Sequence, residues 1–407
     1  MASEPGLRNC KLRGPVITGS EGEFADMDMW YKGMDISSLL EVEECGGKFR
    51  DRGQEKNALE ILKDYGMNLV RLRLWNDPYD EDGNPYGAGT NDLSRTMIMA
   101  GRVKKLGLPW LLDIHYSDFW VDPGKQCVPK AWKNYNEEEL ETAVYSYTGE
   151  VLNKLRESNL LPQIVAVGNE VTNGLLWPFG KVPNYKNIVR FINAGIRAVR
   201  EVDEKIACMI HLDNGGNNAL YRKWFDRYFN CGGMDFEYIG LSYYPFWHGS
   251  LQDLENNMTD IALRYRKKLI VAEVSTAFTM EDYRDYEKLP DDRRKGMAAK
   301  KELTERVPFP MTKQGQADFM DALTDVICRV PENLGCGFIY WEPAWLPVPG
   351  SQWANDNAIR YMNEKGPGGN EWANQALFDY DGNVNPALHV IRDRKVLSGF
   401  PDDVKTI

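Results

Sequence analysis

Several features that mark common functional classes are missing from this 407-residue sequence. No stretch approaches the roughly 20 consecutive apolar residues that a membrane-spanning helix needs, and the mean hydropathy is −0.50. Basic residues are outnumbered by acidic ones, 49 against 60, and the net charge of −11 gives no basic surface for nucleic acid or anionic lipid. We therefore expect no transmembrane segment and no nucleic-acid partner.

Cysteine patterns and leader sequences are also missing. The seven cysteines are odd in number and widely spaced, and no CxxC or Cys/His zinc spacing occurs, so we predict mostly buried thiols rather than disulfides or a zinc site. Residues 1–16 mix charge, proline and glycine without an apolar core, so no signal peptide is visible.

What the sequence does contain is a regular alternation of short apolar strands and amphipathic helices from about residue 30 to its end. The predicted strands cover 31–36, 68–74, 109–114, 163–167, 205–210, 238–242, 268–272 and 337–340. The predicted helices that follow them cover 58–65, 93–106, 137–157, 185–202, 220–229, 251–265, 315–330 and 386–397.

Eight such units are the number found in a (β/α)8 TIM barrel. A doubly wound open sheet also alternates strands and helices, but it should carry a glycine-rich phosphate turn after its first strand, where this chain has Asp35-Ile36-Ser37-Ser38. We therefore predict an α/β fold with a single (β/α)8 catalytic domain over residues 28–400 and long βα loops. Residues 1–27 form an N-terminal extension and residues 401–407 a C-terminal tail.

Two glutamates each end an apolar strand without a break. Glu170 follows the fourth strand and Glu273 the seventh, so their side chains can face one another across the mouth of a barrel. Hydrolysis of a glycosidic bond needs such a pair, because one carboxylic acid protonates the leaving oxygen while one carboxylate attacks or activates water. Either glutamate alone could equally close a strand through an ion pair.

The second and third strands place charged residues near this pair. Arg71 and Arg73 share the parity of Trp75, so all three can point into the barrel, where buried cations need carboxylate partners. An arginine beside Glu273 would favour its charged form, whereas Glu170 should have a raised pKa to hold a proton. Asp113 and His115 could form a metal pair, but two ligands without others favour a hydrogen-bonding histidine.

Aromatic residues make up 12 % of the chain, and most of the 12 tryptophans follow strand ends. The apolar C–H face of a sugar ring stacks on an aromatic plane, and its hydroxyls bond to Asp, Asn and His. Aromatics on several loops therefore favour a polymer in a long groove. The alternative, that tryptophans anchor loops as a second core, is strongest for Trp132 and Trp372.

Seven segments together resemble the arabinogalactan endo-β-1,4-galactanases, glycoside hydrolase family 53, in the clan of retaining (β/α)8 glycosidases. The resemblance covers about residues 28–395. Its motifs lie at 32–37 (KGMDIS), 71–78 (RLRLWNDP), 115–126 (HYSDFWVDPGKQ), 168–178 (GNEVTNGLLWP), 242–249 (SYYPFWHG), 340–345 (YWEPAW) and 374–379 (NQALFD).

The resemblance implies endo-cleavage of β-1,4-galactan, the side chain of type I arabinogalactan, by double displacement with retention. It places the acid/base at Glu170 and the nucleophile at Glu273, with Asn169 on the hydroxyl next to the reacting carbon. Arg71, His115, Trp341 and either Tyr243 or Tyr244 would line the reacting subsite. Asp35, Trp75, Asp118, Trp120, Trp177, His211, Trp247 and Trp345 complete the predicted substrate-binding set.

Two features of the seventh and eighth loops stay open. The family usually follows its nucleophile with Thr-Ala and an aromatic residue, whereas this chain has extra residues in Glu273-Val274-Ser275-Thr276-Ala277-Phe278. Some bacterial members look stabilised by calcium between these loops, and oxygen ligands are present here without fixed spacing. These are Asp282, Asp285, Asn355, Asp356 and Asn357. We expect no cofactor to be required for catalysis.

The sequence therefore predicts a monomeric, retaining endo-galactanase whose partner is a polysaccharide, and whose substrate implies a secreted or cell-surface location. One alternative is a clan member that cuts another β-1,4-glycan, such as mannan, xylan or glucan, with the same catalytic residues. The other is a glycan-binding surface protein on an inactive barrel, which the presence of both glutamates disfavours.

Overall fold

The computed structural model describes residues 30–283, 301–365 and 368–394. The predicted N-terminal extension and C-terminal tail lie outside the described residues, as does the end of the last predicted helix. The domain boundaries at 28 and 400 therefore stay predictions.

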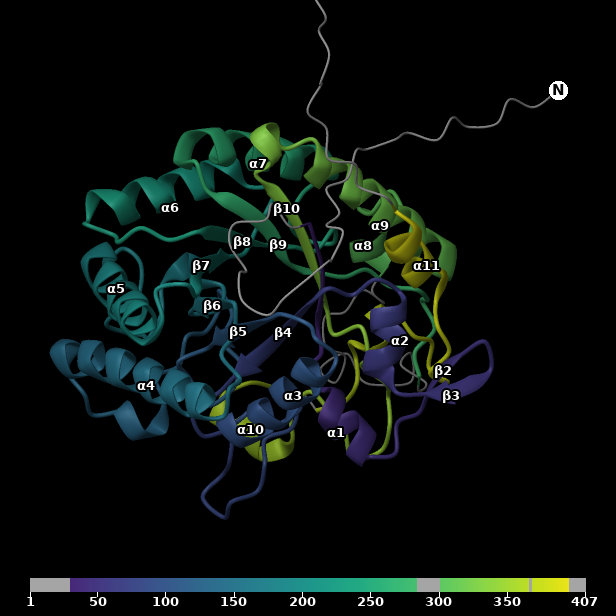
Figure 1. Ribbon diagram of the computed structural model, residues 1–407, viewed down its shortest axis with the longest axis horizontal. Helices are drawn as coiled ribbons and strands as arrows, with labels where there is room; N and C mark the ends of the chain where they lie inside the picture. The colour runs from purple at the N-terminus through teal and green to yellow at the C-terminus, as the bar shows by residue number, and fades with distance from the viewer. Residues whose placement is uncertain (1–29, 284–300, 366–367, 395–407) are drawn as a thin grey trace, which may run out of the picture.

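Eight parallel strands close into a barrel, as predicted (Figure 1). The first strand pairs with both the second and the eighth along the chain, which closes the ring. The barrel strands are β1 (Tyr31–Asp35), β4 (Leu69–Leu74), β5 (Trp110–Ile114), β6 (Ile164–Val167), β7 (Ala207–Leu212), β8 (Tyr238–Tyr243), β9 (Lys268–Val274) and β10 (Gly335–Trp341).

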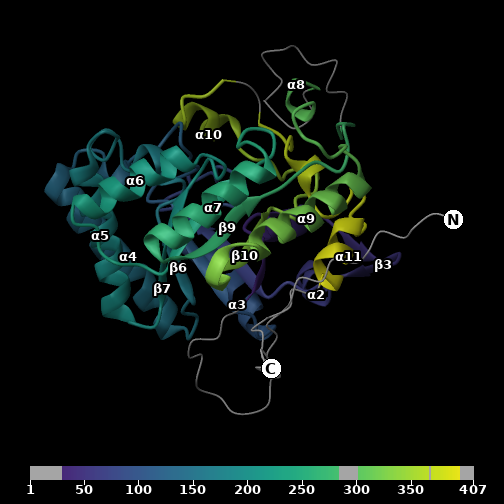
Figure 2. The same cartoon turned by 90° about the horizontal axis from the view of Figure 1, so that it is seen from above.

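Helices surround the barrel, and the longer ones bury apolar residues against it (Figure 1). They are α1 (Leu39–Glu44), α2 (Ala58–Asp64), α3 (Leu93–Lys105), α4 (Glu137–Glu157), α5 (Tyr185–Val202), α6 (Asn218–Asn230), α7 (Leu251–Tyr265), α8 (Lys301–Thr304), α9 (Lys313–Cys328), α10 (Asp356–Tyr361) and α11 (Pro386–Asp393). Figure 2 shows α8 and α10 on one side of the molecule, in the connections that follow β9 and β10.

The predicted helices at 137–157, 185–202 and 251–265 have the observed bounds, because each starts at a residue that can cap it. Asn136 and Ser250 both form capping boxes, and Asn184 accepts from the backbone of Asn187. Helices α1 and α10 and a hairpin of β2 (Phe49–Asp51) and β3 (Gln54–Lys56) were not predicted from the sequence. These elements are three to six residues long, too short for apolar periodicity to reveal them.

Two apolar layers, separated by the wall of the barrel, explain where the polar strand ends point. Residues of one parity pack outward against the helices, and those of the other parity form a small cluster inside the barrel. The inner cluster includes Leu69, Leu111, Ile164, Met209 and Ile270. Toward the carboxyl ends of the strands the inner rows become polar, and that is where the candidate site lies.

Among the residues that the structure describes, no helix combines the length and apolarity needed to cross a bilayer.

Candidate active site

Arg71 is the centre of the polar layer. It continues the inner row above Leu69, is 1 % exposed, and its Nη2 lies 2.7 Å from Asp113 Oδ2 and 2.8 Å from Glu273 Oε1. Its Nη1 lies 2.9 Å from Asp35. Burial opposes the charge on Arg71, but the carboxylates around it raise its pKa. The inward arginine thus contacts three carboxylates, and Glu273 is one of them.

Arg73 occupies the next inward position of the same strand. Its Nη1 lies 3.2 Å from Asp35, and its Nη2 lies 2.6 Å from Glu342 at the end of β10. Its guanidinium also stacks over the ring of Trp120, 4.4 Å from the centroid. Asp35 accepts from both arginines and from Ser37, so it is fully committed to holding the arginines in place.

Glu273 reaches the barrel interior because β9 is irregular. Ile270 and Ala272 belong to the inner cluster, and simple alternation would turn Glu273 outward. The register between β8 and β9 shifts at Leu241/Ser242, so that Ser242 pairs with Glu273, and the extra residue brings the carboxylate inward. There Oε2 accepts a 2.7 Å bond from the hydroxyl of Tyr244. Two donors, one of them charged, therefore hold this carboxylate.

Glu170 lies opposite in a different environment. It follows β6 in the left-handed backbone region, with φ 45°, and is 9 % exposed. Burial, then the charges of Glu273 and Asp213, raise its pKa well above its usual range. The raised pKa agrees with the sequence prediction. Glu170 is thus suited to hold a proton, while Glu273 faces the cation of Arg71, which is the division of roles that acid and nucleophile require.

A set of hydrogen bonds links Glu170 to the strands beside it. Oε1 of Glu170 lies 2.6 Å from Ser242 Oγ, and this serine Oγ lies 2.8 Å from Nε2 of His211. Nδ1 of His211 lies 2.9 Å from Oδ1 of Asn169, which also accepts from Arg71. Both ring nitrogens of His211, predicted to bind substrate, are therefore engaged within the protein.

His115 is a hydrogen-bonding residue. Its Nδ1 accepts from Nε1 of Trp75 at 3.0 Å, so the proton of a neutral ring is on Nε2, 3.0 Å from Asp113. Trp75 is fully buried and packs against Phe119 and Trp120. His115 and Trp75, which were both predicted to bind substrate, are thus bonded to other groups of the protein and support the site.

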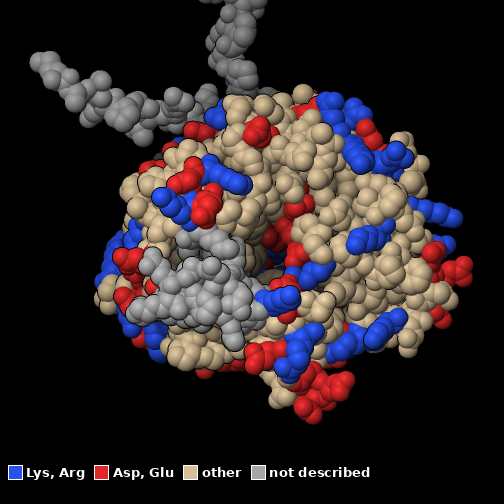
Figure 3. All heavy atoms as spheres, turned by 180° about the vertical axis from the view of Figure 1, so that it is seen from behind, with Lys and Arg blue, Asp and Glu red and all other residues tan. Residues whose placement is uncertain are grey.

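Aromatic rings form one side of the site. Trp341 packs against Trp120, Trp345 and Trp372, with centroids 5.6–6.2 Å apart. Trp247 lies 6.4 Å from Trp372 and is 39 % exposed. Figure 3 shows that the face seen from behind Figure 1 is hollowed near its centre, with acidic side chains inside the hollow. The loop tryptophans therefore form both a second core and an accessible edge.

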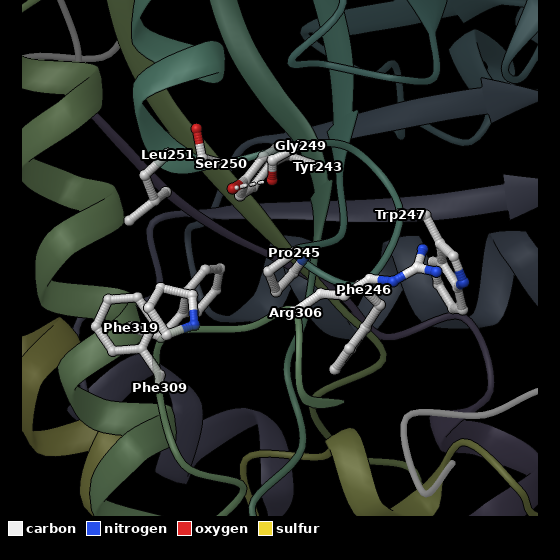
Figure 4. Close-up of a pocket in the computed structure, with 11 residues that line it drawn as sticks. Tyr243, Pro245, Phe246, Trp247, Gly249, Ser250, Leu251, Arg306, Phe309 and Phe319 are labelled. Atoms are coloured by element: carbon white, nitrogen blue, oxygen red, sulfur yellow. Dashed lines mark hydrogen bonds between the residues drawn. The ribbon is translucent and has the colours of Figure 1, made fainter. Parts of the chain in front are cut away.

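Tyr243 and Tyr244 point in opposite directions. Tyr244 has the inward parity of Ser242 and contacts Glu273, whereas the hydroxyl of Tyr243 donates to Gly249 at 2.9 Å. The Tyr243 ring stacks on Phe319 and lines a separate, largely apolar pocket with Phe309 (Figure 4). The structure thus brings Tyr244, and not Tyr243, to the candidate site.

The other predicted residues lie farther out or are engaged. Asp118 accepts from the backbone of Lys130 at 2.6 Å, and burial raises its pKa to about 6. Trp345 is buried and donates to Asn370, while Trp177 donates to Asn173 and has Lys181 over its ring. Trp120 donates to the carbonyl of Trp353.

Two of the calcium candidates, Asn355 and Asn357, are engaged in other bonds. Asn355 caps α10 through Ala358 and donates to Pro85, and Asn357 bonds to Asp80 and Arg360. Asp285 lies outside the described residues. Within the described ranges no group of three or more His, Cys, Asp or Glu side chains is placed to hold a metal ion. A structural calcium ion stays a prediction.

Two contributors, Ser242 and Glu342, were not predicted from the sequence. Ser242 could have been found by parity, because it shares the inward alternation of Tyr238 on β8. Glu342, 2 % exposed, was recognised as a strand end but not as the partner of Arg73. The extra residues after Glu273 lead into a segment joined to the last loop, where Phe278 N donates to Asn374 O at 2.9 Å.

Comparison with known proteins identifies the family of this chain. The model of glycosyl hydrolase family 53 matches residues 31–391. The endo-β-1,4-galactanase of Bacillus subtilis is 36 % identical over 89 % of this chain and 85 % of its own length. The arabinogalactan endo-β-1,4-galactanase A of Aspergillus niger is 34 % identical over 82 % and 90 %.

The solved GH53 catalytic domain of Ignisphaera aggregans is 38 % identical, with a TM-score of 0.81 over 93 % of this chain and 99 % of that one. A family model that covers nearly the whole described chain, relatives above 30 % identity, and a matching fold all agree. This chain belongs to glycosyl hydrolase family 53.

Proposed function

We propose that this chain is a retaining endo-β-1,4-galactanase that acts on galactan and type I arabinogalactan. The observation that carries the proposal is the unequal pair of carboxyl groups. Glu273 is held by Arg71 and Tyr244, whereas burial raises the pKa of Glu170. The relatives that are named as galactanases indicate which bond is cleaved and in which polymer.

In the first step, Oε1 or Oε2 of Glu273 attacks the anomeric carbon while Glu170 gives its proton to the leaving glycosidic oxygen. A covalent glycosyl-enzyme forms, and the shortened chain leaves with its new hydroxyl. In the second step, Glu170 takes a proton from water, the water oxygen attacks the anomeric carbon, and Glu273 is released as a carboxylate.

The substrate-binding roles follow from where the residues lie. Arg71 and Tyr244 keep Glu273 oriented, and Asn169, held by Arg71 and His211, is placed beside Glu170. Trp341 and Trp247 offer aromatic planes on which sugar rings can stack. A groove with several such planes suits internal cleavage of a polymer, and the natural setting of that polymer places the enzyme outside the cell or on its surface.

The test is hydrolysis of a panel of purified β-1,4-galactan, mannan, xylan and glucan. We expect internal cleavage of galactan, with a ladder of galacto-oligosaccharides, and β-configured reducing ends released first in proton NMR spectra. Preferential cleavage of another glycan would overturn the substrate, and release of the α-anomer first would overturn the double displacement. Binding without any product would favour a glycan-binding protein instead.

A further inference from the structure

The hydroxyl of Ser242 lies between two buried groups that both compete for it. Its Oγ is 2.8 Å from Nε2 of His211 and 2.6 Å from Oε1 of Glu170, and the side chain is fully buried. A serine hydroxyl has one hydrogen to donate. The direction in which Ser242 donates therefore depends on which nitrogen of His211 carries the proton.

Asn169 fixes the tautomer of His211. The amide nitrogen of Asn169 donates to the carbonyl of Val121 at 3.0 Å, so Oδ1 is the atom that faces Arg71 and Nδ1 of His211, both at 2.9 Å. Because an amide oxygen can only accept, Nδ1 must carry a hydrogen. Burial, then the charge of Arg71, lower the pKa of His211 to about 3, so the ring is neutral and Nε2 has a free lone pair.

From this geometry we propose that His211 and Ser242 act as positioning residues that hold the catalytic proton on Glu170 in the free enzyme. With its hydrogen directed at Nε2 of His211, Ser242 meets Glu170 as an acceptor. The hydrogen in the 2.6 Å contact then belongs to the protonated carboxyl of Glu170. This inference rests on the proposed function, since it concerns the residue assigned as acid/base.

Ionisation of Glu170 in the free enzyme disturbs the series of hydrogen bonds that joins His211, Ser242 and Glu170. Ser242 must then either face a carboxylate with its lone pairs or turn its hydrogen to Glu170 and leave Nε2 of His211 without a donor. An unpaired buried polar atom is costly in either case. During catalysis Glu170 gives its own proton to the leaving oxygen, Ser242 keeps its proton and turns it to the new carboxylate, and Glu170 later regains a proton from water.

Other groups also face these residues, and they stay constant across the variants described below. Glu170 faces Glu273 on β9, Asp213 after β7, Asp122 in the loop after β5, Tyr244 after β8 and Tyr221 on α6. His211 faces Arg71 on β4, Asp113 on β5 and His115 just after β5. A comparison of variants at positions 211 and 242 therefore isolates what the His211–Ser242 hydrogen bond contributes to the pKa of Glu170.

The tautomer can be measured in the wild-type protein without any activity. The sequence has four histidines, and ¹⁵N-histidine labelling with a His211→Gln variant assigns the signals of His211. We expect a neutral ring with the proton on Nδ1 and a bare Nε2, unchanged from about pH 5 to 8. A proton on Nε2, or a ring that becomes charged in this range, would overturn the proposal.

The effect on Glu170 is measured from the pH profile of kcat/KM on β-1,4-galactan. The apparent pKa of its alkaline limb reports the pKa of the general acid in the free enzyme. His211→Leu frees Ser242 to donate to the Glu170 carboxylate, so the limb should move about one pH unit lower. The same replacement in a Ser242→Ala background should not move it, because the connecting hydroxyl is gone. His211→Gln, which offers Ser242 an acceptor, should move the limb less than His211→Leu.

The proposal would be overturned if the alkaline limb of kcat/KM did not shift in His211→Leu. It would also be overturned if the limb shifted equally in the Ser242→Ala background. If His211→Leu does not fold, the tautomer measured in the wild type decides the question. A wild-type enzyme that leaves galactan uncut contradicts the proposed function, whereas the tautomer experiment still tests the hydrogen bonding between His211, Ser242 and Glu170.

Discussion

Nη2 of Arg71 lies 2.8 Å from Oε1 of Glu273, in a site where the arginine is 1 % exposed. This contact joins the second strand of the barrel to the seventh, across the interior. It means that the same guanidinium that stabilises the fold also orients the proposed nucleophile. Changes at Arg71 should therefore affect stability and catalysis together.

Replacing Arg71 by Met should destabilise the protein by about 3–5 kcal/mol, because three buried carboxylates would lose their contact with this cation. Urea unfolding followed by circular dichroism measures this change. Arg264→Met is the matched control, since Arg264 pairs with Asp226 on the surface and its loss should leave the unfolding free energy nearly unchanged. Similar unfolding curves for the two variants would contradict the role given to the network.

Glu273→Gln should reduce kcat on galactan by ~10⁴-fold or more, because an amide cannot form the glycosyl-enzyme. Binding of galacto-oligosaccharides, measured by calorimetry, should largely persist. Retained turnover would remove Glu273 from the role of nucleophile.

Glu170→Gln should lower kcat on galactan by ~10²–10⁴-fold, the usual contribution of a general acid. With an aryl galactoside whose leaving group needs no protonation, formation of the glycosyl-enzyme should be much less affected, and a burst of aryl alcohol should be seen. Equal losses on both substrates would show that Glu170 does not act as the acid.

Trp247→Ala should raise KM for galactan about 5- to 10-fold and leave kcat nearly unchanged, because the exposed ring offers stacking energy away from the reacting bond. Leu263→Ala, another exposed apolar residue but on helix α7, serves as the control and should change neither constant. A fall in kcat with constant KM in Trp247→Ala would place the ring at the reacting subsite instead.

Acid should destabilise the protein partly through His248. Burial lowers the pKa of His248 from 6.5 to about 4, and its Nδ1 is 3.1 Å from the backbone nitrogen of Tyr244. The unfolded chain takes up this proton first, so the contribution of the neutral ring is present above pH 6.5 and is lost as the pH falls toward 4.

His248→Gln removes this titration. The unfolding free energy of the wild type, measured relative to the variant, should therefore fall by more than about 1 kcal/mol over that range. Urea unfolding at a series of pH values measures the difference, which should be constant above neutral pH. A difference that does not change with pH would contradict a buried neutral ring.

The alternation of strands and helices determined the barrel, because a period of two and a period of 3.6 are read directly from the order of apolar residues. Most long elements were predicted to within a few residues, while the short hairpin β2–β3 and helix α10 carry too few apolar positions to be recognised. The two glutamates were also recognisable, since each interrupts an apolar strand at its carboxyl end.

Only the tertiary structure decided how these residues act. Simple alternation along β9 turns Glu273 outward, and the shifted register against β8 brings it to Arg71. Whether Tyr243 or Tyr244 reaches the site follows from the same parity once the inner row is known. The sequence fixes which chemical groups lie at the strand ends, but their charges and hydrogen-bond directions arise from burial and from partners on other strands, which are distant along the chain.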